Sequence, residues 1–172
     1  YSKKQPVSAL NNKALSFVYC KQLETEQLNT TLIIESSWGS VTLETRLLGE
    51  FNIDNILATF AVLCASGFPI EKVANALSNF KGIPGRMEYF TAENKPLLIV
   101  DYAHTPDALE KALMALRPYC QGQLYCVFGC GGDRDVGKRA EMGSVAERYA
   151  DHIVITNDNP RSEVPESITN EI

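Results

Sequence analysis

The stretch Leu124-Tyr125-Cys126-Val127-Phe128-Gly129-Cys130-Gly131-Gly132-Asp133-Arg134-Asp135 joins an apolar run to a glycine-rich turn and an arginine. The run from Leu124 to Phe128 is short and continuously apolar, which is typical of a strand covered on both faces of a parallel sheet. The glycines of the turn would let the backbone approach a ligand closely. The spacing does not fit the dinucleotide fingerprint G-x-G-x-x-G, because Arg134 stands where its third glycine belongs. The chain also contains no G-x-x-x-x-G-K-[ST] phosphate loop.

Similar apolar runs stand on either side of this stretch. Leu97 to Val100 precedes it, and His152 to Thr156 follows it. Between these strands, apolar residues recur at helical spacing: Leu109, Ala112, Leu113 and Leu116, then Met142, Val145, Ala146 and Tyr149. Thr105-Pro106 should open the first of these helices, and Pro165 should open a third. Strands that alternate with helices predict an α/β fold with a Rossmann-like parallel βαβαβ sheet.

The first half of the chain predicts a different arrangement. From Thr31 to Leu48 apolar and polar residues alternate, which favours an antiparallel pair of strands with one covered face. Two helices should follow, with Asn52 as the cap of the first and Gly67 at its end. The turn Gly82-Ile83-Pro84-Gly85 indicates a joint between two domains, placed at residues 1–86 and 87–172.

Composition narrows the class of protein. The 172 residues include 16 Lys and Arg against 21 Asp and Glu, and the net charge of −5 argues against a nucleic-acid partner. No apolar run approaches the length of a membrane span, and Tyr1 to Pro6 lack the apolar region of a signal peptide. The odd number of cysteines, five, favours reduced cytosolic thiols, so we expect a cytoplasmic protein without a zinc site. The absence of an initiator Met favours a piece of a longer chain.

Polar clusters follow each predicted parallel strand, at the edge where such sheets bind ligands. They are Asp101 to Pro106, Asp133 to Asp135, and Asn157 to Arg161. Asp101 is placed to accept hydrogen bonds from a ribose, although a solvated loop carboxylate is the alternative. The third cluster is also good turn chemistry. Arg134 of the second cluster is expected near Arg161 of the third. Together with Asn159, these two arginines could bind the carboxylate of an amino acid.

Five motifs, in order along the chain, resemble those of the Mur ligase family. Leu48 to Ala58 resembles a motif near the end of the family's central ATPase domain. Gly85-Arg86-Met87-Glu88 resembles the hinge motif, and Asp101 to Pro106 resembles the D-Y-A-H-x-P stretch. Gly131 to Asp135 and Asp158-Asn159-Pro160-Arg161 resemble the members that add the third peptide residue. The D-N-P-R form is the one associated with meso-diaminopimelate.

The resemblance implies that residues 1–86 are the end of a central ATPase domain, strands plus two helices. Residues 87–172 would be the first part of a truncated Rossmann-like C-terminal domain. The implied activity is ATP-dependent amide-bond formation in peptidoglycan synthesis, through an acyl phosphate. The implied substrates are a UDP-N-acetylmuramoyl-dipeptide and meso-diaminopimelate. The phosphate loop and the Mg²⁺ ligands would lie before Tyr1, so we expect residues 1–172 alone to be inactive and assign no catalytic residue.

The resemblance also implies roles for individual residues. The implied nucleotide contacts, three from each domain, are Asn52, Asn55, Arg86, Asp101, Tyr102 and His104. The implied contacts of the incoming amino acid are Arg134, Asp158, Asn159, Pro160 and Arg161. The expected form is a monomer that does not insert into a membrane.

Two other interpretations remain open at this point. One is a relative with a different substrate, such as a lysine-adding or folylpolyglutamate-type ligase, which a substrate panel distinguishes. The other is a nucleotide-binding module without a catalytic role, which the length of the reading frame before Tyr1 distinguishes.

Overall fold

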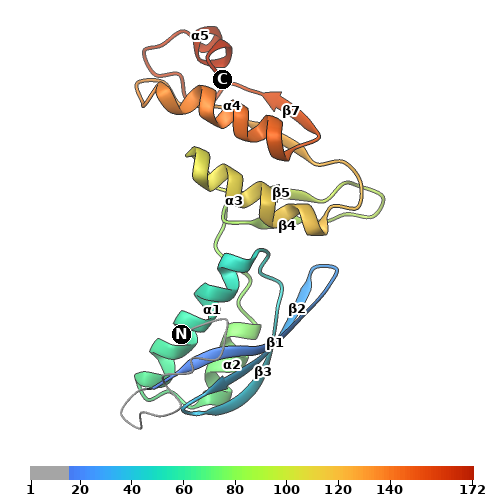
Figure 1. Cartoon of the computed structure of the whole chain (residues 1–172), viewed down its shortest axis with the longest axis vertical. Coiled ribbons are helices and arrows are strands. Elements are labelled where there is room, and N and C mark those ends of the chain that lie inside the picture. The colour runs from blue at the N-terminus through green and yellow to red at the C-terminus, as the bar shows by residue number, and fades with distance from the viewer. Residues whose placement is uncertain (1–15) are drawn as a thin grey trace. The chain divides into compact units, whose positions relative to one another are not determined.

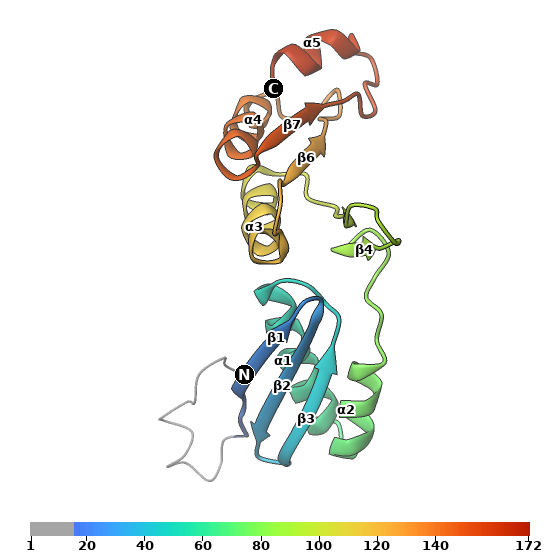
Figure 2. The same cartoon turned by 90° about the vertical axis from the view of Figure 1, so that its right-hand side faces the viewer.

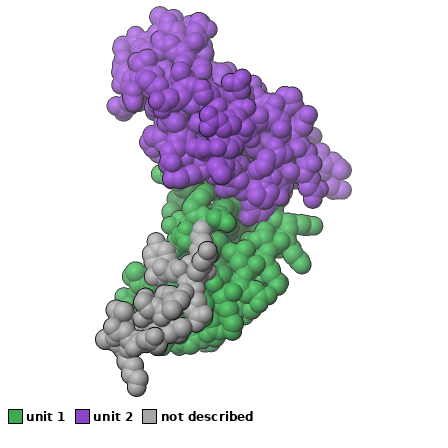
Figure 3. All heavy atoms as spheres, viewed as in Figure 1, with its two compact units in different colours: residues 1–88 green, residues 89–172 purple. Residues whose placement is uncertain are grey.

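The computed structural model describes residues 16–172, and the chain divides after Glu88 into two compact units (Figure 3). The expectation that Tyr1 to Pro6 lack a signal peptide lies outside the described residues. Within residues 16–172, none of the helices combines the length and the apolar character that crossing a membrane requires. The assignment of residues 1–86 and 87–172 to two domains of a ligase stays a prediction.

Unit 1 contains an antiparallel sheet of three strands in the order β1 (Val18–Glu26), β2 (Asn29–Ser36) and β3 (Gly39–Thr45). Alternate residues of β2 and β3 point into the core, which confirms the predicted antiparallel pair. Strand β1 was not predicted. Its register shifts between Cys20 and Gln22, and every residue after Cys20 is exposed. A bulge of this kind removes the alternation by which a strand is recognised in a sequence.

Two helices, α1 (Glu50–Ala65) and α2 (Ile70–Ser78), cover one face of this sheet (Figures 1 and 2). Their apolar stripes meet the buried side of the strands around Phe60, which is fully buried. The end of α1 before Gly67, whose φ is +90°, is confirmed. The predicted cap was wrong: the helix begins at Glu50, and Gly49 occupies the cap position with φ +90°. Asn52 lies inside the first turn, where its Nδ2 donates to the Leu48 carbonyl at 2.8 Å.

Unit 2 is built around two parallel strands, β6 (Tyr125–Phe128) and β7 (His152–Ile155). The helices α3 (Pro106–Leu116) and α4 (Gly137–Tyr149) pack together, and their apolar residues form the core with β6. The short helices η1 (Arg117–Tyr119) and α5 (Pro165–Asn170) complete the unit. The α/β class and the Rossmann-like parallel arrangement are thus confirmed.

The first predicted parallel strand behaves differently from the other two. Strand β5 (Leu98–Val100) is hydrogen bonded to β4 (Glu88–Phe90) in a separate two-stranded sheet. The prediction of β5 as a strand is confirmed, but its predicted place in the parallel sheet was wrong, because apolar periodicity does not say which strands are neighbours.

Thr105 caps α3, as predicted, with its Oγ1 accepting from the Ala108 N–H at 3.3 Å. We expect Thr105→Ala to lower the free energy of unfolding of unit 2 by about 1 kcal/mol, because an amide of the first helical turn loses its acceptor. Urea denaturation followed by circular dichroism measures this change. Thr105→Ser keeps the hydroxyl and should retain most of the stability. Equal losses in the two variants would contradict a capping role.

Candidate functional site

The candidate site consists of the two loops that follow β6 and β7, and these loops pack directly against each other. The Thr156 N–H donates to the Phe128 carbonyl at 2.9 Å, and the Gly132 N–H donates to the Asn159 carbonyl at 2.9 Å. A Cβ added at Gly132 would lie 1.9 Å from the Pro160 carbonyl oxygen. The neighbouring loop therefore requires a glycine at position 132. From the sequence, this glycine was explained by the close approach of a ligand alone, which is incomplete.

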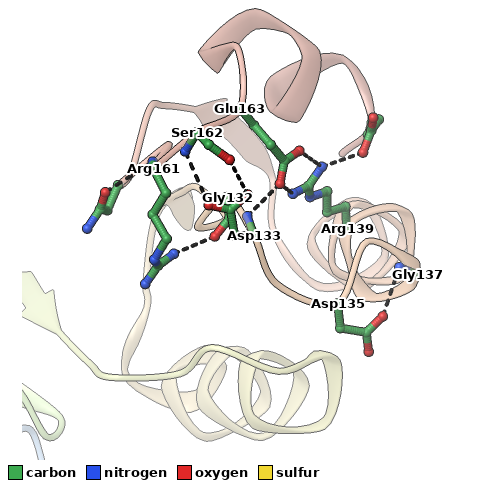
Figure 4. Close-up of polar contacts among 10 residues, drawn as sticks. Gly132, Asp133, Asp135, Gly137, Arg139, Arg161, Ser162 and Glu163 are labelled. Carbon is green, nitrogen blue, oxygen red and sulfur yellow. Dashed lines mark hydrogen bonds and ion pairs between the residues drawn. The ribbon is translucent and has the colours of Figure 1, made fainter.

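Arg161 belongs to the loop after β7 and has a left-handed conformation with φ +51°, and its guanidinium reaches the glycine turn (Figure 4). Its Nη1 donates to the Gly132 carbonyl at 2.5 Å, and its backbone N–H donates to the Asn159 Oδ1 at 3.2 Å. Left-handed backbone costs a residue other than glycine about 1 kcal/mol or more and persists only where surrounding contacts fix it. These contacts define both the direction of the Arg161 side chain and its backbone.

Asp133, at the end of the glycine turn, is the second left-handed residue of the pair of loops, with φ +50°. Its carboxylate accepts from the Ser162 hydroxyl at 2.6 Å and from the Ser162 N–H at 3.2 Å. These hydrogen bonds from Ser162 lower the pKa of the Asp133 carboxyl below its usual range. A charged Asp133 thus helps to join the loops.

Asp158, Asn159 and Pro160 lie beside this junction. Cys130, Asp158 and Pro160 contribute to a shallow hollow, whose other lining residues are Thr156, Asn157, Pro165, Ile168 and Thr169. Arg134 is exposed and directly follows Asp133 in the turn. That its guanidinium converges with that of Arg161 stays a prediction.

The loop after β5 is ordered by its own polar groups. Asp101 Oδ1 accepts from the Ala103 N–H at 2.9 Å, and His104 Nδ1 lies 3.1 Å from the Tyr102 carbonyl oxygen. The rings of Tyr102 and His104 meet edge to face, with their centroids 5.4 Å apart. Lys138 Nζ donates to the His104 carbonyl at 2.8 Å, which ties this loop to the first turn of α4. No sequence motif pointed to Lys138.

Three of the residues implied as nucleotide contacts belong to unit 1. Asn52 and Asn55 lie together near the start of α1, where Asn55 Nδ2 donates to Asn52 Oδ1 at 3.2 Å. Arg86 is exposed, and its backbone N–H donates to the Ile83 carbonyl at 3.0 Å. The structure thus brings Asn52 and Asn55 together, and places Arg86 after the turn that precedes β4.

Residues 85–172 match the family model described as the Mur ligase, glutamate ligase domain. The chain belongs to the Mur ligase family. Over 139 residues, 81% of the chain, it is 55% identical to the UDP-N-acetylmuramoyl-L-alanyl-D-glutamate–2,6-diaminopimelate ligase of Coxiella burnetii. This match spans 28% of that relative.

Solved Mur ligase structures resemble the chain as well. A structure of UDP-N-acetylmuramoyl-L-alanyl-D-glutamate–2,6-diaminopimelate ligase is 39% identical, with a TM-score of 0.60 over 90% of this chain and 31% of that one. The Mycobacterium tuberculosis folylpolyglutamate synthase is 22% identical, with a TM-score of 0.68 over 90% of this chain and 35% of that one. The second likeness concerns the fold alone. This Mur ligase chain thus spans about a third or less of the length of these relatives.

The sequence of this Mur ligase chain did not reveal an ion pair in which a buried arginine holds two partly exposed carboxylates. Arg139 of α4 is completely buried, and it pairs with Glu163 and with Glu171. In the sequence, Arg139 stands in the charged run Gly137-Lys138-Arg139-Ala140-Glu141, which is typical of an exposed helix face. Its distance of 24 residues from Glu163 gave no signal of the contact.

We expect the ion pair to make the stability of unit 2 depend on pH. The hydrogen bonds from Arg139, and then from the Asp133 N–H, lower the pKa of the Glu163 carboxyl below its usual range. A lowered pKa in the folded state stabilises the fold fully above the unfolded pKa of about 4.3, and this contribution is lost as the pH falls through the folded value. We therefore expect the melting temperature to fall upon acidification below that pH, and to fall less steeply in Glu163→Gln.

Thermal denaturation between neutral and acidic pH, followed by circular dichroism, measures this dependence. Glu141→Gln removes the same charge from an exposed position of α4 and serves as the control. An acid profile of Glu163→Gln that coincides with those of the wild type and Glu141→Gln would show that Glu163 has no part in the transition.

Residues 16–172 include no group of three or more His, Cys, Asp or Glu side chains arranged to hold a metal ion.

Proposed function

We propose that this chain is part of an ATP-dependent ligase that adds meso-diaminopimelate to UDP-N-acetylmuramoyl-L-alanyl-D-glutamate in peptidoglycan synthesis. The observation that carries the proposal is the loop Asp158-Asn159-Pro160-Arg161, in which hydrogen bonds fix both the backbone and the guanidinium of Arg161. The relative from Coxiella burnetii, whose name specifies 2,6-diaminopimelate, supports the choice of amino acid. The route through an acyl phosphate follows from the family resemblance.

The chemistry of the two loops fits an amino acid with a carboxylate at each end. Arginine offers a planar fork that pairs with a carboxylate through two parallel hydrogen bonds. We assign Arg161 to the distal carboxylate of diaminopimelate, and Arg134 with Asn159 to its other polar groups. The exposed carboxylate of Asp158 is assigned to an ammonium group. Pro160 packs against Gly132, because its carbonyl oxygen occupies the space that a Cβ at that glycine would need.

ATP is the proposed cofactor, with Mg²⁺ bound by residues outside this chain. Asn52, Asn55 and Arg86 of unit 1, together with Asp101, Tyr102 and His104 of unit 2, remain the proposed nucleotide contacts. His104 Nδ1 lies within hydrogen-bond distance of the Tyr102 carbonyl, so we assign Nε2 as the ring nitrogen that meets the nucleotide. ATP supplies the activating phosphoryl group, while these side chains would orient it. We further propose a cytoplasmic monomer.

The proposal is tested with a substrate panel on the complete ligase. The complete ligase is the protein in which this chain is joined to the further segments that its relatives contain. Amide formation is measured with ATP, with either the UDP-N-acetylmuramoyl-dipeptide or a folate as the carboxylate substrate, and with meso-diaminopimelate, L-lysine or L-glutamate as the amine. The proposal requires diaminopimelate to have the highest kcat/KM. Preference for lysine would establish the lysine-adding alternative, and glutamate transfer to a folate would establish the folylpolyglutamate alternative. Nucleotide binding without amide formation from any amine would establish the non-catalytic module.

A further inference from the structure

Arg139 carries its charge inside unit 2, where an unpaired guanidinium would be strongly unfavourable. Its side chain is 1% exposed. Nη1 and Nη2 donate to the two carboxylate oxygens of Glu163 at 2.9 and 2.8 Å, which forms a bidentate pair, and Nη1 also donates to Glu171 at 2.5 Å. The charge of this arginine is thus used to hold two carboxylates that follow β7 in the chain.

Glu163 extends this contact to the glycine turn. Its Oε1, already bonded to Arg139, also accepts from the Asp133 N–H at 2.6 Å. The Asp133 carboxylate in turn accepts from the Ser162 hydroxyl and N–H. Figure 4 shows these groups side by side, with Arg161 on one side of Asp133 and Ser162 and with Arg139 on the other. Helix α4 is therefore connected to both loops through a continuous set of hydrogen bonds.

Arg161 is attached to the residues next to this network at two points. Along the backbone it directly precedes Ser162, which Asp133 holds. Through its guanidinium it bonds to the carbonyl of Gly132, which directly precedes Asp133. A shift of Asp133 or of Ser162 therefore moves the Arg161 guanidinium.

We propose that Arg139 and Glu163 are positioning residues, which fix the loop that carries Arg161 and thereby set the affinity of the ligase for its amino-acid substrate. The proposal rests on the proposed function, in which Arg161 binds diaminopimelate. Neither residue needs to touch the substrate, since Arg139 belongs to α4 and the Glu163 carboxylate is bonded to Arg139 and to the Asp133 N–H.

Glu163→Gln compared with Glu171→Gln tests this role in the complete ligase. Each variant removes one carboxylate from Arg139, but only Glu163 is bonded to the glycine turn. The amide nitrogen of glutamine would face a donor of Arg139 or of Asp133. We expect Glu163→Gln to raise the KM for diaminopimelate by about 10-fold or more, since small misplacements of binding groups have large effects. The KM values for ATP and for the UDP-dipeptide should stay unchanged, and Glu171→Gln should leave all three unchanged.

Combining Glu163→Gln with Arg161→Ala distinguishes positioning from a general loss of stability. If Glu163 acts through Arg161, Glu163→Gln should change the KM for diaminopimelate much less when Arg161 is already absent. An unchanged KM in Glu163→Gln, an equal rise of all three KM values, or additive effects in the double variant would overturn the inference. A wild type that prefers another amino acid would overturn the proposed substrate instead. The same KM comparison, made with that amino acid, would then still decide the positioning role.

Discussion

Arg161→Ala is expected to lower the kcat/KM of the complete ligase for meso-diaminopimelate by roughly 10⁴-fold, which is the lower end of the range over which polar sites reject analogues without the matching group. Diaminopimelate differs from lysine by one carboxylate on its distal carbon. The loop after β7 holds the Arg161 guanidinium at the Gly132 carbonyl, so its remaining N–H donors have a defined direction. Without them, the distal carboxylate would be desolvated and left without its partner.

Steady-state kinetics with diaminopimelate and lysine, together with a nucleotide-binding titration, measure this effect. ATP binding should survive the substitution, and lysine should gain relative to diaminopimelate even if its absolute rate stays low. Arg161→Lys should recover only part of the loss, because an ammonium group cannot form the planar fork. Arg46→Ala, at an exposed position of unit 1, is the control for loss of an arginine elsewhere. Wild-type kinetics in Arg161→Ala would reduce Arg161 to a turn residue and remove the main support for the substrate.

Gly132→Ala is expected to separate the two loops of the candidate site. The new Cβ would lie 1.9 Å from the carbonyl oxygen and 2.6 Å from the carbonyl carbon of Pro160, both backbone atoms that no side-chain rotation can clear. Overpacking of this kind costs about 1–3 kcal/mol and occasionally more. The Gly132 N–H would move away from the Asn159 carbonyl, and the Gly132 carbonyl away from Arg161. We therefore expect a destabilised unit 2 and a ligase with little activity towards diaminopimelate.

Hydrogen exchange in β6 and β7 measures the stability part of this prediction, because amide protection there reports on opening of unit 2. Fluorescence of the chain's single tryptophan would not serve, since Trp38 belongs to unit 1. Gly122→Ala is the matched control: a Cβ at Gly122 has no atom within 4 Å, so its protection pattern should equal that of the wild type. Wild-type protection and wild-type kinetics in Gly132→Ala would mean that the loops do not pack as described.

The elements of the fold that were predicted from sequence are those with a clean local signal. Apolar runs predict β6 and β7, and apolar residues at helical spacing predict α3 and α4. Thr105 and Pro165 predict where α3 and α5 begin. Strand β1 carries a bulge after Cys20, and β4 has only three residues, so neither shows a usable period. The pairing of β5 with β4 is a property of the tertiary structure, which spacing along the chain does not encode.

In the candidate site too, the residues with a local sequence signal were predicted and those defined by long-range contacts were not. Asp158 to Arg161 was selected from its own residues and from a family motif, and the structure places it against the glycine turn. Arg139 and Glu163 were missed, because their pairing joins a helix to a loop far along the chain. The role of Gly132 was assigned to ligand access, because a sequence shows that a side chain is absent but not which neighbour requires the space. Long-range contacts, rather than residue types, were the missing information.

The measurement that tests the account most directly is a crystal structure of the complete ligase with meso-diaminopimelate bound. The account predicts the distal carboxylate within about 3 Å of the Arg161 guanidinium, in the geometry of a charge-assisted hydrogen bond. Arg161 should keep its bond to the Gly132 carbonyl, and Glu163 should remain bonded to both Arg139 and Asp133. Diaminopimelate bound elsewhere, or bound with its distal carboxylate facing solvent while Arg161 points away, would contradict the central claim.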